Sequence, residues 1–353
     1  MNFYRTIGRP TLLALALGDV ERAHWLAIRA GIAAQMVPGL LDIIRLLYQA
    51  EDEPVDVFGR RFRNPLGVAA GVDKNAHLPG LWEAAGFGFY EAGTVTPLPQ
   101  VGNIRPRLYA IPQARALLNA LGFNNDGARA VRENVSPWKP RVHFPIAISL
   151  GTRKETPKTV RYVLCDYGVL LVELYDYGDF FVVNISSPNT KGLRGLQDPE
   201  NVRLLVRGVV EQVAELAAEP ERSQQPKRVL VKFAPDFPSD NALIESVQAA
   251  VEGGASGVIL FNTTQKRPAS YLYPKLADKA GGYSGPHTID TTIDGVGRVH
   301  QYFPDLPIIG VGGINSRGGF DRVIEAGAVL AQVNTAIGYG GLGTASEVLT
   351  RTH

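Results

Sequence analysis

The stretch PIIGVGGINSRGGFDRVIEAGAVLAQVNT, residues 307–335, decides the fold. A short apolar run opens it, the glycine turn Gly312-Gly313 follows, and a helical segment then leads through Gly327 to a second apolar run. A strand, a helix and a second strand in this order form a βαβ unit, in which the two strands lie parallel in one sheet. The stretch therefore predicts a parallel sheet that is covered by helices.

Eight apolar runs of this kind follow one another along the chain, each before a turn rich in Gly, Asn, Ser or Thr and usually before a helix. They are residues 66–70, 89–95, 145–150, 180–185, 229–233, 257–261, 307–311 and 329–333. Strands that are apolar along their whole length are typical of parallel sheets buried on both faces. Eight such units predict an α/β fold, a closed (β/α)8 TIM barrel over residues 51–353, with a doubly wound open sheet as the alternative. We expect the long segments after the second and sixth runs to be loops over one end of the barrel.

The composition excludes several classes of protein. The 353-residue chain has 45% hydrophobic and 20% charged residues and a net charge of +2, which is typical of a globular protein and gives no basic stripe for nucleic acid. Its one cysteine, Cys165, cannot form a disulfide within the chain and fits a reducing compartment. The six histidines do not show the spacing of metal ligands, so we expect no metal site.

Residues 1–50 form a second region, which is rich in apolar residues with arginines between them. We expect three short helices there, around residues 4–17, 20–30 and 39–48. So small a segment cannot bury all these side chains within itself. They either dip into a membrane surface or pack on the barrel or on a second subunit, and the sequence favours neither reading. No signal peptide is evident, and we expect no transmembrane helix.

Polar residues and glycines follow seven of the eight runs. The active site of a TIM barrel lies at the carboxyl ends of its strands, so this pattern predicts a large polar ligand at the barrel mouth. Gly312-Gly313 and Asn334-Thr335 stand where such barrels usually bind phosphate, because glycines let backbone N–H groups approach an anion. A tight turn that requires positive φ explains the two glycines equally well.

Lysines and asparagines at the strand ends also allow two readings. Lys74 and Lys232 are either surface lysines or face the ligand, where a positive charge near a flavin would stabilise its anionic reduced form. Asn184, Asn189 and Asn262 either bond to their own turns or offer donors and acceptors to a planar, amide-rich substrate.

The segment NISSPNT, residues 184–190, followed by Gly192-Leu193-Arg194, resembles the catalytic loop of class 2 dihydroorotate dehydrogenases. Class 1 members have a cysteine at the position of Ser187, so the serine indicates the quinone-linked class. No His–Asp partner order marks Ser187 as the nucleophile of a hydrolase. Further segments between about Phe3 and Ile337 resemble the same family, namely residues 64–74, 93–97, 121–125, 231–232, 262–264, 281–285 and 308–314.

The resemblance implies an enzyme that oxidises (S)-dihydroorotate to orotate in pyrimidine (UMP) biosynthesis, with one FMN per chain and a membrane quinone as electron acceptor. It implies a peripheral protein, monomer or homodimer, on the cytoplasmic side of the inner membrane. Ser187 would take the C5 proton, with Thr190 and Lys74 as further catalytic residues, while the C6 hydride passes to the flavin. Tyr4 and His24 would line the quinone tunnel, although their spacing differs from that of the family.

The remaining site residues implied by the resemblance form two sets. The set for FMN is Ala70, Gly71, Lys74, Thr94, Ser149, Asn184, Lys232, Phe261, Gly285, Gly313, Asn334 and Thr335. The set for dihydroorotate is Lys74, Asn119, Ala120, Leu121, Gly122, Phe123, Asn184, Asn189, Asn262 and Thr263.

Five positions depart from the family pattern, one of them a lysine that is replaced within Gly151-Thr152-Arg153. Ser149 replaces an asparagine, Phe261 a threonine, Asn334 a tyrosine, and Ala110 an arginine near the quinone. Either the flavin is bound more weakly or neighbouring residues compensate. Two other functions stay open: a class 1-like barrel flavoenzyme that uses fumarate or NAD, and a non-catalytic membrane-peripheral binding protein. Ser187 and the apolar N-terminal region count against the first, and the intact set of polar site residues counts against the second.

Overall fold

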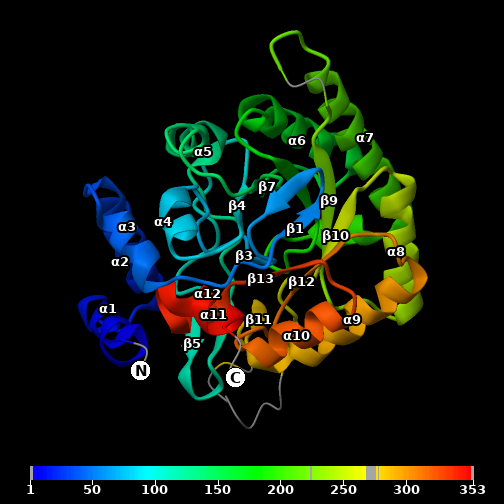
Figure 1. Ribbon diagram of the computed structural model, residues 1–353. Helices are drawn as coiled ribbons and strands as arrows, with labels where there is room; N and C mark the ends of the chain where they lie inside the picture. The colour runs from blue at the N-terminus through cyan, green and yellow to red at the C-terminus, as the bar shows by residue number, and fades with distance from the viewer. Residues whose placement is uncertain (1–2, 223–224, 268–275, 277, 351–353) are drawn as a thin grey trace.

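The computed structural model describes residues 3–222, 225–267, 276 and 278–350. Eight parallel strands form a closed barrel in the order β10-β12-β13-β3-β4-β7-β8-β9, and β9 pairs with β10 to complete the ring (Figure 1). The strands are β3 (Leu66–Val68), β4 (Phe89–Val95), β7 (Ile146–Leu150), β8 (Phe180–Asn184), β9 (Arg228–Phe233), β10 (Gly257–Leu260), β12 (Ile308–Val311) and β13 (Leu330–Val333). Each lies within one of the eight apolar runs or overlaps it, so the prediction of a closed barrel is confirmed.

Apolar side chains seal the amino end of the barrel. A hairpin of β1 (Val55–Val57) and β2 (Arg60–Phe62) lies across this end, and its rings Phe58 and Phe62 pack against Phe180 with centroid distances of 5.5 and 6.4 Å. Phe62, Phe89 and Phe180 are fully buried in the same apolar cluster. Because this end is filled, the open space of the barrel is left at the carboxyl ends of the strands.

Helices surround the barrel, as the repeated βα pattern predicts (Figure 1). They are α4 (Pro79–Ala84), α5 (Gly127–Val135), α6 (Val160–Leu174), α7 (Pro199–Ala217), α8 (Asp240–Glu252), α9 (Ile289–Tyr302), α10 (Arg317–Glu325), α11 (Thr335–Gly340) and α12 (Thr344–Leu349). Their apolar faces pack on the strands, and most of these side chains belong to one continuous core cluster. The free energy of this burial, rather than helix propensity, holds the ring of helices in place.

We expected the long segments after β4 and β10 to be loops, but parts of both form a second sheet. β5 (Leu108–Ile111), β6 (Ala116–Asn119) and β11 (Gly282–Ser284) form an antiparallel sheet in the order β11-β6-β5. In its register Gly282 lies opposite Asn119, which brings together two segments far apart in the sequence. Asn119, at the end of β6, is one of the residues expected to bind substrate.

The N-terminal region forms four short helical segments beside the barrel, drawn in blue in Figure 1. They are a π-helical turn (Tyr4–Gly8), α1 (Arg9–Leu15), α2 (Val20–Met36) and α3 (Leu40–Leu47). The second helix runs to Met36, beyond the expected end near residue 30. It starts at Asp19, whose carboxylate accepts hydrogen bonds from the N–H groups of Glu21 and Arg22.

One face of this region packs on the barrel and the opposite face is exposed. A Cβ at Gly31 would lie 2.9 Å from the Leu78 side chain, so the glycine allows α2 to approach α4 closely. Large apolar side chains remain exposed on the other face: Leu15, Leu17, Met36, Val37, Ile43, Leu46 and Leu47. Packing on the barrel thus accounts for only part of the apolar surface. Among the described residues no single helix has the length and hydropathy to cross a membrane, whereas α2 and α3 meet that test as a pair bent by 114°.

Candidate active site

One cavity of about 580 Å³ opens at the carboxyl ends of the barrel strands and extends to α1 and α2. Its size lies in the range of small-molecule sites, roughly 300–1,000 Å³. It brings together Lys74, Ser187, Lys232 and the Gly312-Gly313 turn, so the strand ends surround one shared space. Of the residues expected to contact cofactor, substrate or quinone, all line this cavity except Ser149, Ala120 and Thr190.

The loop after β8 places Ser187 among amide side chains. Ser187 is buried, and its Oγ accepts a hydrogen bond of 3.3 Å from the N–H of Asn189. The Asn189 Nδ2 donates to Asn119 Oδ1 at 2.9 Å, and the Asn262 Nδ2 donates to Ser186 Oγ at 2.9 Å. The loops after β8 and β10 and the end of β6 therefore present their amides to the same part of the cavity.

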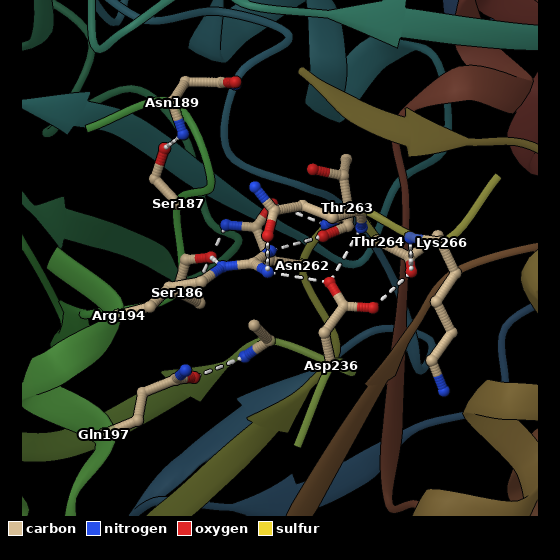
Figure 2. A network of polar contacts seen from close by, with 12 residues as sticks. Ser186, Ser187, Asn189, Arg194, Gln197, Asp236, Asn262, Thr263, Thr264 and Lys266 are labelled. Carbon is tan, nitrogen blue, oxygen red and sulfur yellow. Dashed lines mark hydrogen bonds and ion pairs between the residues drawn. The ribbon is translucent and has the colours of Figure 1, made fainter. Parts of the chain in front are cut away.

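Arg194 connects the loops after β8 and β10 through hydrogen bonds to both, and it does not line the cavity (Figure 2). Its guanidinium donates to the carbonyl oxygens of Ser186, at 3.0 Å, and of Thr263, at 2.9 Å. It also forms an ion pair of 2.7 Å with Asp236. Burial alone would raise the pKa of Asp236, but hydrogen bonds from Thr264 and the Gln265 N–H, together with the Arg194 charge, lower it. Arg194 thus holds the backbone on both sides of the amides without reaching the cavity.

Two lysines bring positive charge into the cavity. The Lys232 ammonium lies 2.8 Å from Glu91 Oε2 in a pair whose side chains are 4% and 0% exposed. Lys74 donates to the Gly71 carbonyl at 3.1 Å and otherwise faces the cavity. Desolvation lowers the pKa of Lys74 to about 8, a shift that the Glu21 carboxylate opposes and the Arg107 charge reinforces. Both lysines face the ligand space, so the surface-lysine reading is wrong.

The polar groups at the mouth fit the flavin that the resemblance implies. Gln332, on β13, is fully buried and lines the cavity, yet neither atom of its amide has a hydrogen-bond partner among the described residues. Buried amides without partners are rare in folded proteins, and a polar ligand in the cavity would give Gln332 the partners that it lacks among these residues. At Gly313, φ is 77° and a Cβ would lie 2.3 Å from the Ile289 nitrogen. The turn therefore requires a glycine at this position, and Gly313 also lines the cavity.

The far end of the cavity is lined by the N-terminal helices. Leu12, Leu13, Trp25, Ile28, Leu342 and Val348 make this part apolar. Tyr4 and His24 lie there as expected. Desolvation, and then the nearby Lys74 charge, lower the pKa of His24 to about 3, so this imidazole is neutral at physiological pH. Burial raises the pKa of Tyr4, so it too is neutral. Arg5, Arg9 and Glu347 also line the cavity, so this end suits an uncharged molecule that has both apolar and polar parts.

Comparison with known proteins identifies the family. The family model described as dihydroorotate dehydrogenase matches residues 54–352. The chain belongs to the dihydroorotate dehydrogenase family. The dihydroorotate dehydrogenase (quinone) of Chloroflexus aurantiacus is 39% identical over 345 residues, which are 96% of this chain and 93% of that protein. The corresponding protein of Salinispora arenicola is 40% identical over 347 residues, 97% of this chain and 96% of its own.

The structure agrees with that of a solved family member. The ligand-free DHODH of Eimeria tenella superposes with a TM-score of 0.81 at 30% identity, covering 94% of this chain and 93% of its own. Family and fold, as predicted from the sequence, are confirmed, and the matching relatives carry the quinone-dependent name.

Positions that depart from the family pattern differ in their relation to the cavity. Phe261 and Asn334 line it, and the Asn334 Nδ2 donates to the Ala70 carbonyl at 3.0 Å. Ser149 lies behind Thr94, with 3.0 Å between the two hydroxyl oxygens. Ala110 lies on β5, outside the residues that line the cavity.

Several residues of the dehydrogenase site were missed at the sequence level. Glu91 and Gln332 lie in the middle of barrel strands, and Glu21 and Arg107 form a buried ion pair beside Lys74. A usable signal existed for the first two, because a charged or amide side chain inside a fully apolar parallel strand is costly unless it meets a partner or a ligand. Glu21 and Arg107 gave no such signal, since both stand in polar surroundings in the sequence.

Proposed function

We propose that this chain oxidises dihydroorotate to orotate, with FMN at the barrel mouth and a membrane quinone as electron acceptor. The observation that carries the proposal is the single cavity, which joins the Ser187 loop at one end to the apolar wall of α1 and α2 at the other. A substrate and a quinone that share one flavin need such an arrangement. The names of the relatives support the same reaction, which places the chain in pyrimidine (UMP) biosynthesis.

Ser187 is the proposed base for the C5 proton of the substrate. It is buried at the cavity wall, and its hydroxyl oxygen is oriented by the Asn189 N–H. A hydroxyl is a weak base at neutral pH, so its contribution depends on exclusion of water and on its position against the reacting carbon. Thr190, buried in the same loop, shapes the path by which the proton leaves.

Lys74 and the amides are the proposed substrate contacts. The Lys74 ammonium pairs with the carboxylate of dihydroorotate, while Asn119, Asn189 and Asn262 offer donors and acceptors to the ring amides. The hydrogen bond between Asn119 and Asn189 holds these two side chains in place before the substrate arrives. Such positioning reduces the entropy that binding would otherwise cost. Ala120, Leu121, Gly122 and Phe123 form the adjoining segment, and Asn184 and Thr263 complete the set.

FMN, when bound, would supply a two-electron acceptor between dihydroorotate and the quinone. We propose that Lys232, held by Glu91, places its positive charge beside the cofactor, with Thr94 and Asn184 as neutral hydrogen-bonding groups. The turn at Gly313 and the residues Asn334 and Thr335 would hold the phosphate. Ala70, Gly71, Phe261 and Gly285 form the remaining walls, and Ser149 acts through Thr94.

The N-terminal region, residues 1–50, is the proposed membrane-associating part, and residues 51–353 the catalytic domain. The exposed apolar side chains of α1, α2 and α3 would enter the cytoplasmic face of the inner membrane, as those of interfacial helices do. A quinone could then pass from the bilayer between these helices, beside Tyr4 and His24, to the flavin. This placement of the N-terminal region at the membrane is compatible with either a monomer or a homodimer.

An anaerobic assay of the flavin-loaded protein tests this proposal. Dihydroorotate should bleach the flavin absorbance, and ubiquinone or menaquinone analogues should restore it faster than fumarate or NAD. Restoration by fumarate or NAD alone would support the class 1-like alternative. A protein that cannot be loaded with FMN would support the binding-protein alternative and exclude the proposed reaction.

A further inference from the structure

A buried ion pair fastens α2 to the barrel. Glu21, in the first turn of α2, accepts hydrogen bonds from Arg107 Nη2 at 2.7 Å and from Arg107 Nε at 3.0 and 3.2 Å. The two side chains are 7% and 2% exposed. Arg105 Nη2 donates a fourth hydrogen bond to the same carboxylate at 3.0 Å. Burial alone would raise the pKa of Glu21, but the two arginines lower it, so the carboxylate is charged.

Arg107 also fixes the loop that precedes β5. Its Nη1 donates to two backbone carbonyls, that of Val101 and that of Asn103 at 2.7 Å. The loop is also tied to the segment after β6, because the Asn103 N–H donates to the Leu121 carbonyl at 3.0 Å. Each of the three guanidinium nitrogens of Arg107 thus donates to one of these acceptors, with the Glu21 carboxylate on one edge of the group and the two carbonyls on the other.

Asn103 connects this loop to residues 185–190, the loop after β8, which we call the substrate loop. Its Nδ2 donates to the carbonyl of Ala120 at 3.0 Å and to the carbonyl of Asn189 at 3.1 Å. Asn189 is the residue whose N–H orients Ser187 and whose amide bonds to Asn119. A continuous series of hydrogen bonds thus runs from Glu21 through Arg107, Asn103 and Asn189 to Ser187.

We propose that Glu21 is a positioning residue for the substrate loop, acting through Arg107 and Asn103. The N-terminal region then does more than form the quinone path, because its second helix also sets the geometry of the dihydroorotate site. This inference rests on the proposed function, since it concerns the placement of the residues assigned to substrate and base.

A role limited to stability is the competing explanation. A buried ion pair is often no more stabilising than an apolar pair of similar volume, so attachment of α2 alone does not require these charges. An apolar pair, however, has no N–H group to donate to the carbonyls of residues 101 and 103, so it could not fix their positions. Asn103 separates the two explanations, because its side chain contacts the substrate loop but takes no part in the ion pair.

The test uses the full-length, flavin-loaded protein and three variants, Glu21→Gln, Asn103→Ala and Asp42→Asn. Asp42 is an exposed acid on α3 that pairs with Arg45, and it serves as the matched control. Orotate binding is measured by its effect on the spectrum of the oxidised flavin, and flavin reduction by dihydroorotate is followed in an anaerobic stopped-flow instrument. Reoxidation by a short-chain quinone and the thermal unfolding midpoint are measured in parallel.

We expect Asn103→Ala and Glu21→Gln to weaken orotate binding about three- to tenfold, the effect of one or two lost hydrogen bonds. Asn103→Ala should keep the parent rate of reoxidation and lower the unfolding midpoint by no more than a few degrees, and Asp42→Asn should match the parent throughout. Parent-like orotate binding in Asn103→Ala would overturn the inference even if Glu21→Gln were unstable. A parent that does not bind orotate would overturn the proposed function and the inference with it.

Discussion

Replacing Lys232 with methionine should strongly destabilise the protein. Replacing both members of its ion pair, Lys232 and Glu91, with apolar residues should not. The change leaves Glu91 fully buried, with no positive charge at 2.8 Å and with its Oε1 already lacking a hydrogen-bond partner among the described residues. Breaking a buried pair in this way costs about 3–5 kcal/mol, because the remaining charge stays desolvated. The double change Glu91→Leu with Lys232→Met removes both desolvated charges and should recover most of that loss.

Urea unfolding of the flavin-free protein, followed by circular dichroism, measures these differences. The flavin is left out because Lys232 is also proposed to hold it, and a bound ligand adds its own stability. Arg129→Met is the matched control, since Arg129 and Glu133 form a pair whose side chains are 82% and 58% exposed. Its cost should stay below about 1 kcal/mol. If Lys232→Met unfolded at the parent urea concentration, or if the double variant were no better than the single one, the argument from the buried charge would be refuted.

Three further changes test separate parts of the site. Ser187→Ala should keep its flavin but reduce dihydroorotate oxidation by about 10²–10⁴-fold, the usual contribution of a positioned base, and a parent rate near neutral pH would show that the base is wrongly assigned. The pKa of Lys74 is lowered to about 8, so its ammonium is present below that pH and lost above it. kcat/KM for dihydroorotate should therefore fall above about pH 8, and Lys74→Arg, whose charge persists, should shift that fall to higher pH. Ala27→Phe narrows the apolar end of the cavity and should raise the KM for quinone at least about tenfold. Its rate of flavin reduction by dihydroorotate should stay at the parent value, and an unchanged quinone KM would place the quinone elsewhere.

The barrel could be predicted because its signal is local. Each strand is an apolar run with a turn behind it, and burial on both faces makes this pattern visible without knowledge of the neighbours. The sheet of β5, β6 and β11 could not be predicted in the same way. Its pairing of Asn119 with Gly282 depends on two segments that only the closed barrel brings together.

The candidate site was predictable to a similar extent. Strand-end residues such as Lys74 and Ser187 could be assigned to one cavity once a barrel was assumed. Glu91 is different, because its role can be inferred only from its ion pair with Lys232, which lies on a strand far along the chain. The pair Glu21 and Arg107 is of the same kind. Residues that act through a distant partner need the fold before their role can be inferred.

From the hydrogen bonds at two of the positions that depart from the family pattern, we propose compensation rather than a weakened flavin site. The shorter Ser149 side chain does not leave a gap in the hydrogen bonding, because its hydroxyl lies 3.0 Å from that of Thr94, which also accepts from Asn184 Nδ2 at 2.7 Å. Thr94 and Asn184 both line the cavity, so the serine supports two cavity residues instead of reaching the ligand itself. Asn334 likewise bonds to the Ala70 carbonyl and ties the end of β13 to the segment after β3. At both positions the shorter side chain forms a hydrogen bond within the wall of the cavity, and under this proposal the contacts to the flavin come from the neighbouring groups that it supports.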